Sequence, residues 1–134
     1  MAVPTSRRRL PALLGRRNGA RGGAIEGTAR LGERTKHLVK RLRPGDIAVI
    51  DHLNIDRIAA EELIEAQVAA VLNASQSSDG KYPNAGPLML VRAGIRLVDA
   101  PGAGLFELLE DGCEVRVEGG EIAVVGGQEI SGRV

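Results

Sequence analysis

From residue 46 onward, short aliphatic runs alternate with stretches whose apolar residues recur at helical spacing. This alternation is typical of an α/β domain. The runs predict strands at 47–50, 68–72, 95–98, 115–117 and 122–125, and a last edge around Ile130. The stretches between them predict helices over about ten residues after Asp56, over 88–93 and over 105–109.

Turn and cap residues limit these elements. Asp56 stands at the N-cap of the first helix, whose apolar stripe consists of Ala59, Ala60, Leu63 and Ile64. Pro87 and Gly94 frame the second helix, since proline favours the first turn of a helix and glycine the position after its end. The Gly119-Gly120 pair predicts a hairpin between the last two runs. We therefore predict a compact α/β domain that ends in a β-hairpin.

The beginning of the chain lacks this pattern. Residues 1–25 combine arginine, glycine and proline with too few apolar residues to offset the entropy of an ordered chain. We predict a disordered basic arm over 1–25 and a single domain over 26–134. Within the domain, 27–31 predicts a short strand and 33–42 a helix that Pro44 ends.

Charge divides the chain in the same way. The 134 residues carry a net charge of +1, but residues 1–43 hold twelve basic and two acidic side chains, which gives +10, and the remainder carries −9. The basic arm and helix are candidates for contact with anionic lipid or nucleic acid. The alternative is a solvated tail, or one folded against the acidic body.

Composition excludes several classes of protein. The length allows one domain. Tyr82 and Phe106 are the only aromatic residues, so the stacking platforms of single-strand binders are absent. The single Cys113 excludes an internal disulfide, and we expect it to be a small buried apolar residue rather than a reactive thiol. No apolar run approaches the roughly 20 residues that cross a bilayer, so we predict a cytoplasmic chain.

The loop over 75–86 is the first candidate site. It follows a predicted buried strand and precedes a helix, where ligands bind in parallel α/β units. Its candidate ligand-binding residues are Ser77 and Ser78 for their hydroxyls, Lys81 for its charge, Tyr82 as a lid and Asn84 for its amide. The alternative is a surface loop with a turn at Asp79-Gly80 and an N-cap at Asn84.

A second candidate site follows the first strand. Asp51, His52 and Asp56 lie close enough in sequence to hold a divalent metal or to act as acid and base. The alternative, which we favour, is that Asp51 accepts from a turn amide, Asp56 caps the helix and His52 is a polar surface residue. We predict no metal, no cofactor and no catalytic residue.

Residues 99–104 suggest a dinucleotide fingerprint, because they follow a strand and open a helix with glycines. Glu107 stands where the third glycine belongs. We therefore predict a plain turn there.

Two resemblances rest on longer stretches. The succession of elements from 43 to 117 resembles the swivelling β/β/α phosphohistidine domain of enzymes that use phosphoenolpyruvate. More closely, the chain is similar to the N-terminal domain of SteA-type cytokinetic ring proteins. That similarity is carried by residues 27–30, 34–36, 42–52, 54–57 and 82–87, and most specifically by Asp51-His52.

The resemblances imply a swivelling β/β/α-type fold and a bacterial protein of cell division and envelope assembly, at the inner face of the membrane at the division site. Complete members of the SteA-type family also carry a thiamine pyrophosphokinase-like domain, which we do not expect within these 134 residues. A phosphohistidine carrier needs a histidine in the 75–86 loop, whereas His37 and His52 lie elsewhere. Phosphoryl transfer is therefore not expected.

These observations predict a non-catalytic binding or scaffold domain whose protein partners belong to the division or envelope machinery. The alternative is a phosphate or nucleotide site formed by Asp51, His52, Lys81, Tyr82 and Asn84, which becomes catalytic only with a thiamine pyrophosphokinase-like second domain.

Overall fold

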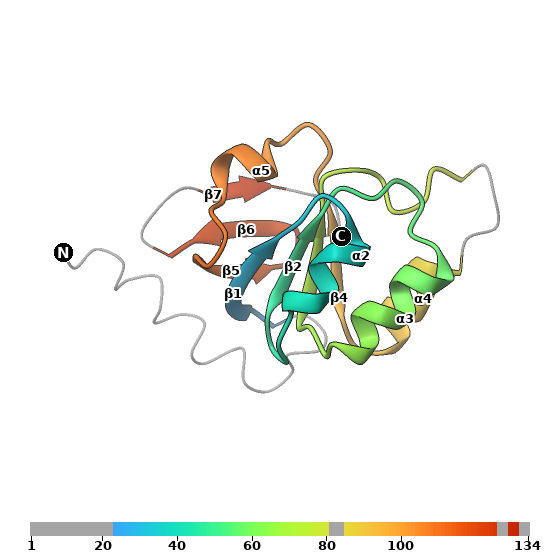
Figure 1. Cartoon of the computed structure of the whole chain (residues 1–134). Helices are drawn as coiled ribbons and strands as arrows, with labels where there is room; N and C mark the ends of the chain where they lie inside the picture. The colour runs from blue at the N-terminus through green and yellow to red at the C-terminus, as the bar shows by residue number, and fades with distance from the viewer. Residues whose placement is uncertain (1–22, 81–84, 126–128, 132–134) are drawn as a thin grey trace.

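The computed structural model describes residues 23–80, 85–125 and 129–131 (Figure 1). Its elements are β1 (Ile25–Leu31), α2 (Thr35–Leu38), η1 (Val39–Arg41), β2 (Ile47–Ile50), α3 (Arg57–Glu65), β3 (Ala70–Asn73), α4 (Gly86–Arg92), β4 (Arg96–Asp99), α5 (Leu105–Leu108), β5 (Glu114–Glu118), β6 (Glu121–Val124) and β7 (Glu129–Ser131). Residues 1–22 lie outside the described part of the chain, so disorder there stays a prediction, whereas the last residue of the predicted arm, Ile25, belongs to β1. No helix in the described residues is long and apolar enough to cross a bilayer.

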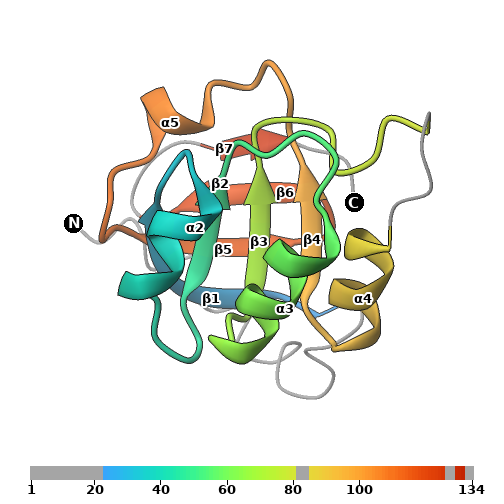
Figure 2. The same cartoon turned by 45° about the vertical axis from the view of Figure 1, so that its right-hand side comes forward.

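The strands form one seven-stranded sheet in the order β4-β3-β2-β1-β5-β6-β7. Strands β1 to β4 pair in parallel, and β5 to β7 pair antiparallel. Strand β1 belongs to both parts, because residues 25–28 pair with β5 and residues 29–31 with β2. The sheet curls at β1, so that β5 to β7 run across behind β2, β3 and β4 (Figure 2).

Glycine is required where β1 changes partner. A Cβ atom on Gly27 would lie 2.6 Å from the carbonyl oxygen of Gly45. Real Cβ atoms do not approach backbone that closely, so the bend depends on a residue without a side chain.

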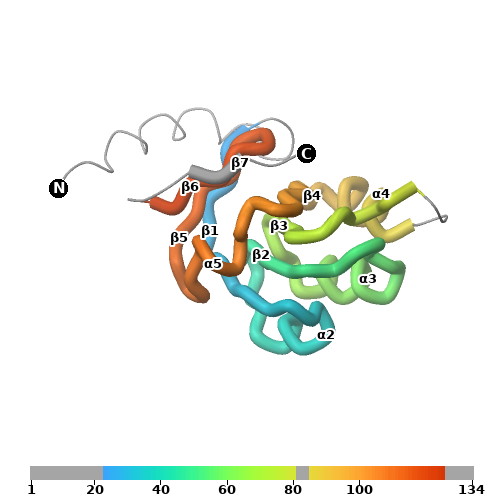
Figure 3. Tube along the Cα trace, turned by 90° about the horizontal axis from the view of Figure 1, so that it is seen from above, coloured from blue at the N-terminus to red at the C-terminus, as the bar shows by residue number. Residues whose placement is uncertain are grey.

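The curled sheet separates two apolar cores, and Figure 3 shows the resulting layers. Helices α2, α3 and α4 cover one face of the parallel strands, where Leu38, Ile50 and Leu63 are buried. The antiparallel strands and α5 cover the other face, where Leu72 and Ile122 are buried. The chain is therefore a mixed α/β domain with helix, parallel-strand and antiparallel-strand layers and a β5–β6 hairpin, which confirms the predicted fold class.

Element boundaries differ from the sequence prediction at two helices. The predicted helix over 33–42 is divided into α2 and the 3-10 turn η1. Helix α4 begins at Gly86 with Ala85 in the N-cap position, and the predicted cap Asn84 lies outside the described residues. A Cβ atom on Gly86 would lie 2.1 Å from the carbonyl oxygen of Ile55, so α4 begins in direct contact with the chain before α3.

Candidate functional site

Three parallel strands end at the same edge of the sheet and deliver polar residues there. Asp51 and His52 follow β2, Asn73 is the last residue of β3, and Asp99 is the last residue of β4. The register pairs Ile50 with Asn73 and Asn73 with Asp99, so these residues are neighbours across the sheet. This edge is where ligands bind in open α/β sheets.

Asn73 is the centre of a buried hydrogen-bond network at this edge. Its side chain is fully buried. The Oδ1 atom accepts from the backbone N–H of His52 at 2.9 Å and of Ser75 at 3.0 Å. The Nδ2 atom donates to the carbonyl oxygen of His52 and to the hydroxyl of Ser77, both at 2.9 Å. All the hydrogen-bonding capacity of this amide is therefore used inside the protein.

The network continues from Asn73 to β4. The hydroxyl of Ser77 donates to Asp99 Oδ1 at 2.5 Å, and the backbone N–H of Ser77 donates to Asp99 Oδ2 at 3.0 Å. Nearer β2, the hydroxyl of Ser75 donates to a carboxylate oxygen of Asp51. The loop after β3 is thus fixed to the ends of both neighbouring strands.

Backbone pairing between two loops extends β2 and β3 beyond the sheet. The N–H of Asn54 donates to the carbonyl of Gln76, and the N–H of Ile55 donates to that of Ser77, each at 2.9 Å. Asn54 adopts a left-handed conformation with φ 57°, and its Oδ1 accepts from the N–H of Asp79 at 2.8 Å. Because this pairing holds the chain over 51–55 in place, it also determines where Asp51 and His52 lie.

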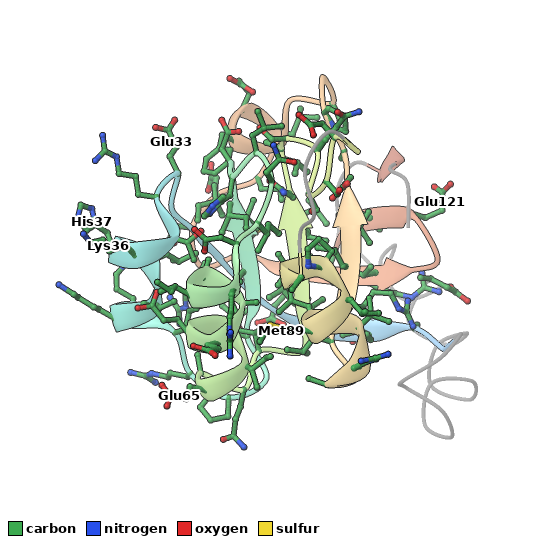
Figure 4. All side chains as sticks on the ribbon, turned by 90° about the vertical axis from the view of Figure 1, so that its right-hand side faces the viewer. Glu33, Lys36, His37, Glu65, Met89 and Glu121 are labelled. Carbon is green, nitrogen blue, oxygen red and sulfur yellow. The ribbon has the colours of Figure 1, made fainter. Side chains whose placement is uncertain are left out.

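A groove lies between α2 and α3 beside this edge, with a volume of about 510 Å³. Its lining residues are Glu33, Arg34, Thr35, Lys36, Asp51, His52, Leu53, Asp56, Ile58, Ala59 and Glu62. Figure 4 shows the side chains of this part, with Glu33, Lys36 and His37 labelled on and beside α2. The groove size falls within the roughly 300–1,000 Å³ of small-molecule sites.

The structure divides the predicted site residues into two groups. Asp51, His52 and Asp56 come together at the groove. Ser77 is only 2% exposed and belongs to the Asn73 network, and the exposed turn after it places the hydroxyl of Ser78 3.4 Å from the N–H of Gly80. Lys81, Tyr82 and Asn84 lie outside the described residues, so their part in a site stays a prediction.

His52 is half-buried and has a side-chain partner on α2. Its Nδ1 atom lies 3.0 Å from the hydroxyl of Thr35, a residue that is 4% exposed. Strand order brings this pair together, since β1 leads directly into α2 and lies next to β2. The proposed role of His52 as a plain surface residue does not match this partly buried, hydrogen-bonded ring.

The two aspartates of the groove already accept hydrogen bonds. Asp56 Oδ1 accepts from the N–H of Ala59 at 2.8 Å, which confirms the predicted N-cap. Asp51 accepts from the Ser75 hydroxyl instead of the turn amide that the sequence suggested. Among the described residues, no group of three or more His, Cys, Asp and Glu side chains is arranged to hold a metal ion.

Basic side chains gather on α2 and η1 and on the residues beside them. Arg34, Lys36, Lys40 and Arg43 are exposed, and Arg34 and Lys36 also line the groove. Arg41 instead binds Asp111, with its Nη1 atom 3.1 Å from Oδ1. Contact of this surface with anionic lipid or nucleic acid stays a prediction.

Asn73 and Asp99 are the site residues that sequence reasoning missed. Asn73 directly follows an aliphatic run, and a polar residue at the end of a buried strand is the signal that indicates it. Asp99 was considered only as part of a glycine-containing turn. The turn itself is plain, as predicted, with positive φ at Gly102 and Gly104.

Comparisons with solved structures show the fold. The chain is similar to a 3-isopropylmalate dehydratase (LeuD) of Methanocaldococcus jannaschii, with 15% identity, 82% of this chain and 81% of that chain covered, and a TM-score of 0.53. It is also similar to a potential metal-dependent hydrolase with cyclase activity, with 14% identity, 82% and 63% covered, and a TM-score of 0.52. A third structure, MccF in complex with glutamyl sulfamoyl guanosine, gives 16% identity, 84% and 39% covered, and a TM-score of 0.47.

The chain thus spans less than two thirds of the length of the hydrolase and of MccF. No protein-family model matches the chain. No curated protein matches it either.

These findings overturn the resemblance to SteA-type cytokinetic ring proteins. The two reported structures with a TM-score above 0.5 are a 3-isopropylmalate dehydratase and a potential metal-dependent hydrolase, and neither is a division protein. The family assignment is therefore wrong, and with it the expected link to cell division and to a thiamine pyrophosphokinase-like domain. A role in envelope assembly and a place at the division site have no support in these similarities.

Residues 42–52 carried part of the resemblance to SteA-type proteins. Their sequence is explained by a local turn rather than by a shared function. Gly45 has a φ of 88°, and Asp46 Oδ2 accepts from the N–H of Arg43 at 2.9 Å. Such residues form the turn that starts a buried strand, and α/β proteins of many functions need that turn.

Proposed function

We propose that this chain is a ligand-binding α/β domain whose groove between α2 and α3 binds a small molecule without catalysing a reaction. The observation that carries the proposal is the composition of the groove. It combines a hydrogen-bonded histidine ring, charged side chains such as Glu62 that have no partner among the described residues, and exposed aliphatic side chains at the carboxyl ends of parallel strands. Small-molecule sites are built in this way, with a few placed polar groups on an apolar surface.

Two exposed aliphatic side chains support an apolar contact. Leu53 is 56% exposed and Ile58 is 67% exposed, and both line the groove. Single exposed aliphatic residues are common on protein surfaces. Here, however, the pair lies beside His52 at the mouth of one groove, where a bound molecule would remove both side chains from water.

The arrangement of hydroxyl groups supports binding without catalysis. Thr35, which carries the hydroxyl nearest to His52, is 4% exposed and therefore poorly accessible to a ligand. The hydroxyls of Ser75 and Ser77 donate to Asp51 and Asp99. A nucleophile must be presented to the substrate beside its base, and these hydroxyls are committed to the protein instead.

The test is a titration of the full-length ¹⁵N-labelled chain with small compounds that share a short alkyl chain and differ in their polar group. We expect at least one compound to shift amide signals of residues 33–36, 51–53 and 56–62. Ile58→Asp should weaken that binding by about tenfold, which corresponds to roughly 1.4 kcal/mol.

Val91→Asp is the matched control, because Val91 is 57% exposed on α4 and does not line the groove. The proposal is wrong if no compound shifts groove signals, or if the two substitutions weaken binding equally.

A further inference from the structure

We infer that the groove selects an uncharged amide, with His52 donating to the amide oxygen and Glu62 accepting from the amide nitrogen. This inference rests on the proposed ligand-binding function and specifies the ligand class of the same groove.

The tautomer of His52 follows from the burial of Thr35. Thr35 is 4% exposed, and among the described residues the one hydrogen-bond partner of its hydroxyl is His52 Nδ1, at 3.0 Å. A buried hydroxyl hydrogen without an acceptor costs about 1–3 kcal/mol, so Thr35 donates to Nδ1. A neutral imidazole whose Nδ1 accepts carries its hydrogen on Nε2.

The ring is held in place by its backbone as well as by its side chain. Both the N–H and the carbonyl of His52 are bonded to Asn73, which is itself fully buried and bonded to Ser77. With Thr35 on Nδ1, His52 is fixed at three atoms. His52 lines the groove, and in the described part of the chain its Nε2 atom has no hydrogen-bond partner, so we assign this donor to the ligand. Such preorganisation lowers the entropy lost on binding.

The groove lining disfavours an anionic ligand. It contains the carboxylates of Glu33, Asp51, Asp56 and Glu62 against the cations of Arg34 and Lys36, so the lining is net negative when His52 is neutral. A carboxylate or phosphate on the ligand would satisfy His52 but would meet this negative surface. A neutral carbonyl oxygen accepts the same hydrogen bond without that repulsion.

Glu62 supplies the acceptor that distinguishes an amide from an ester or a ketone. Of the other three carboxylates in the lining, Asp51 and Asp56 each already accept a hydrogen bond, and Glu33 is exposed to solvent. The half-buried side chain of Glu62 has no hydrogen bond among the described residues. It follows Ile58 by four positions on α3, so both lie on the helix face that lines the groove. An amide with a short alkyl chain would use His52, Glu62 and Ile58 together.

The first measurement needs no ligand. In the full-length chain at a pH well above the ordinary titration range of histidine, long-range ¹H–¹⁵N spectra report the tautomer of each imidazole. We expect His52 to be almost entirely the Nε2–H form. His37, which is exposed on α2, is the internal control and should show a mixture. Thr35→Val should return His52 to the mixture, and Thr35→Ser should preserve the single form. A mixture at His52 in the unsubstituted chain would overturn the inference.

The second measurement compares butyramide, butyrate and butylamine by amide shifts in the groove. We expect butyramide to bind at least threefold more tightly than the isosteric butyrate. His52→Leu should weaken butyramide binding about tenfold, whereas His52→Gln, which keeps a donor, should retain most of it. Glu62→Ala should weaken it about threefold, and Glu65→Ala should not, since Glu65 lies at the exposed end of α3 and outside the groove (Figure 4).

The outcomes separate the two proposals. Tighter groove binding of butyrate or butylamine than of butyramide would overturn the amide inference and leave the ligand-binding function standing. Absence of groove shifts with all three compounds, and with the wider set used for the proposed function, would overturn both.

Discussion

The parallel part of the sheet, β1 to β4, differs from the antiparallel part, β5 to β7, in how the backbone groups at its strand ends are hydrogen-bonded. In the β5–β6 hairpin, Glu118 pairs with Glu121 across a two-residue turn, so the backbone satisfies itself locally. At the carboxyl ends of β2, β3 and β4 the chain leaves the sheet through loops, and their N–H and carbonyl groups need other partners. Asn73, Ser77 and Asp99 supply them. The candidate site therefore lies at the edge where the topology of the sheet leaves backbone groups without strand partners and side chains bind them instead.

Burial differs between the two parts as well. Every residue of β2 and β3 is buried, because helices cover one face and the antiparallel strands the other. Strand β5 alternates, with Val115 and Val117 buried and Arg116 on the opposite face. Parallel strands are normally covered on both faces and antiparallel ones on one. We therefore expect substitutions at the polar edge of the parallel part to lower the free energy of unfolding more than substitutions on the exposed face of the antiparallel part.

The largest difference should come from Asn73→Ala. It leaves the N–H and the carbonyl of the half-buried His52 without their partner and empties a fully buried place, and unsatisfied buried groups cost about 1–3 kcal/mol each. We expect a loss of about 4 kcal/mol in the free energy of unfolding, measured by urea denaturation. Thr28→Ala is the control from β1 where it pairs with β5: its hydroxyl donates to Glu114 at 2.7 Å on the exposed surface, and its loss should cost less than about 1 kcal/mol. Equal costs would contradict the comparison.

The next largest loss in the free energy of unfolding should be equal in the parallel and antiparallel parts of the sheet. Leu72→Ala on β3 and Ile122→Ala on β6 each remove a fully buried side chain from the same apolar core. Each should lower the free energy of unfolding by about 3 kcal/mol, through lost burial and the cavity that remains. Chemical denaturation followed by circular dichroism measures both. A much smaller cost for Ile122→Ala would mean that the antiparallel part contributes little to a common core.

A smaller effect is expected at the boundary between the two parts. Gly27→Ala would place a Cβ atom 2.6 Å from the Gly45 carbonyl oxygen, so the turn that carries Gly45 must shift. Overpacking of this kind costs roughly 1–3 kcal/mol, and we expect about 2. Thermal unfolding and amide shifts near residues 43–46 would measure it. An unchanged midpoint together with unchanged shifts would show that the bend tolerates a side chain.

The smallest effect concerns Asp111, which ties β1 and η1 to the turn before β5. The N–H of Leu31 donates to its Oδ1 at 2.8 Å, and this bond, followed by Arg41 and Arg30, lowers the pKa of Asp111 below its ordinary 3.8 despite the opposing effect of burial. A carboxylate whose folded pKa is lowered stabilises the fold above the unfolded pKa, and that contribution disappears as the pH falls through the folded pKa.

Because the side chain of Asp111 is 44% exposed, Asp111→Asn should cost less than about 1 kcal/mol at pH 7. The difference from the unsubstituted chain should shrink towards zero below pH 3.8, and denaturation at neutral and acid pH would measure it. A difference that grows on acidification would contradict the assignment.

Local signals predicted most of the fold. The caps and turns at Asp56, Pro87 and Gly119 were read correctly, because a cap or a turn involves residues a few positions apart. Strands β2, β4, β5 and β6 lie within one residue of the aliphatic runs that indicated them. The predicted strand over 68–72 stopped one residue short of Asn73 and so missed the centre of the network.

The candidate site was only partly predictable, because its contacts join residues far apart in the sequence. Thr35 and His52 are separated by 17 positions, His52 and Asn73 by 21, and Ser77 and Asp99 by 22. Hydrophobic periodicity shows that these residues follow strands or open helices. It does not show that β1, β2, β3 and β4 lie in order and in parallel, and this order is what brings them together.

Arg96 shows the same limit. As a basic residue at the start of a predicted strand, it gives no sequence signal of burial. In the folded chain it is 8% exposed and donates to the carbonyl of Gly23 at 3.0 Å. The sequence by itself determined the elements, their caps and the α/β class, because neighbouring residues encode them. The tertiary structure alone decided the curl at Gly27, the groove between α2 and α3 and the fixed ring of His52, because these depend on which strands and helices become neighbours.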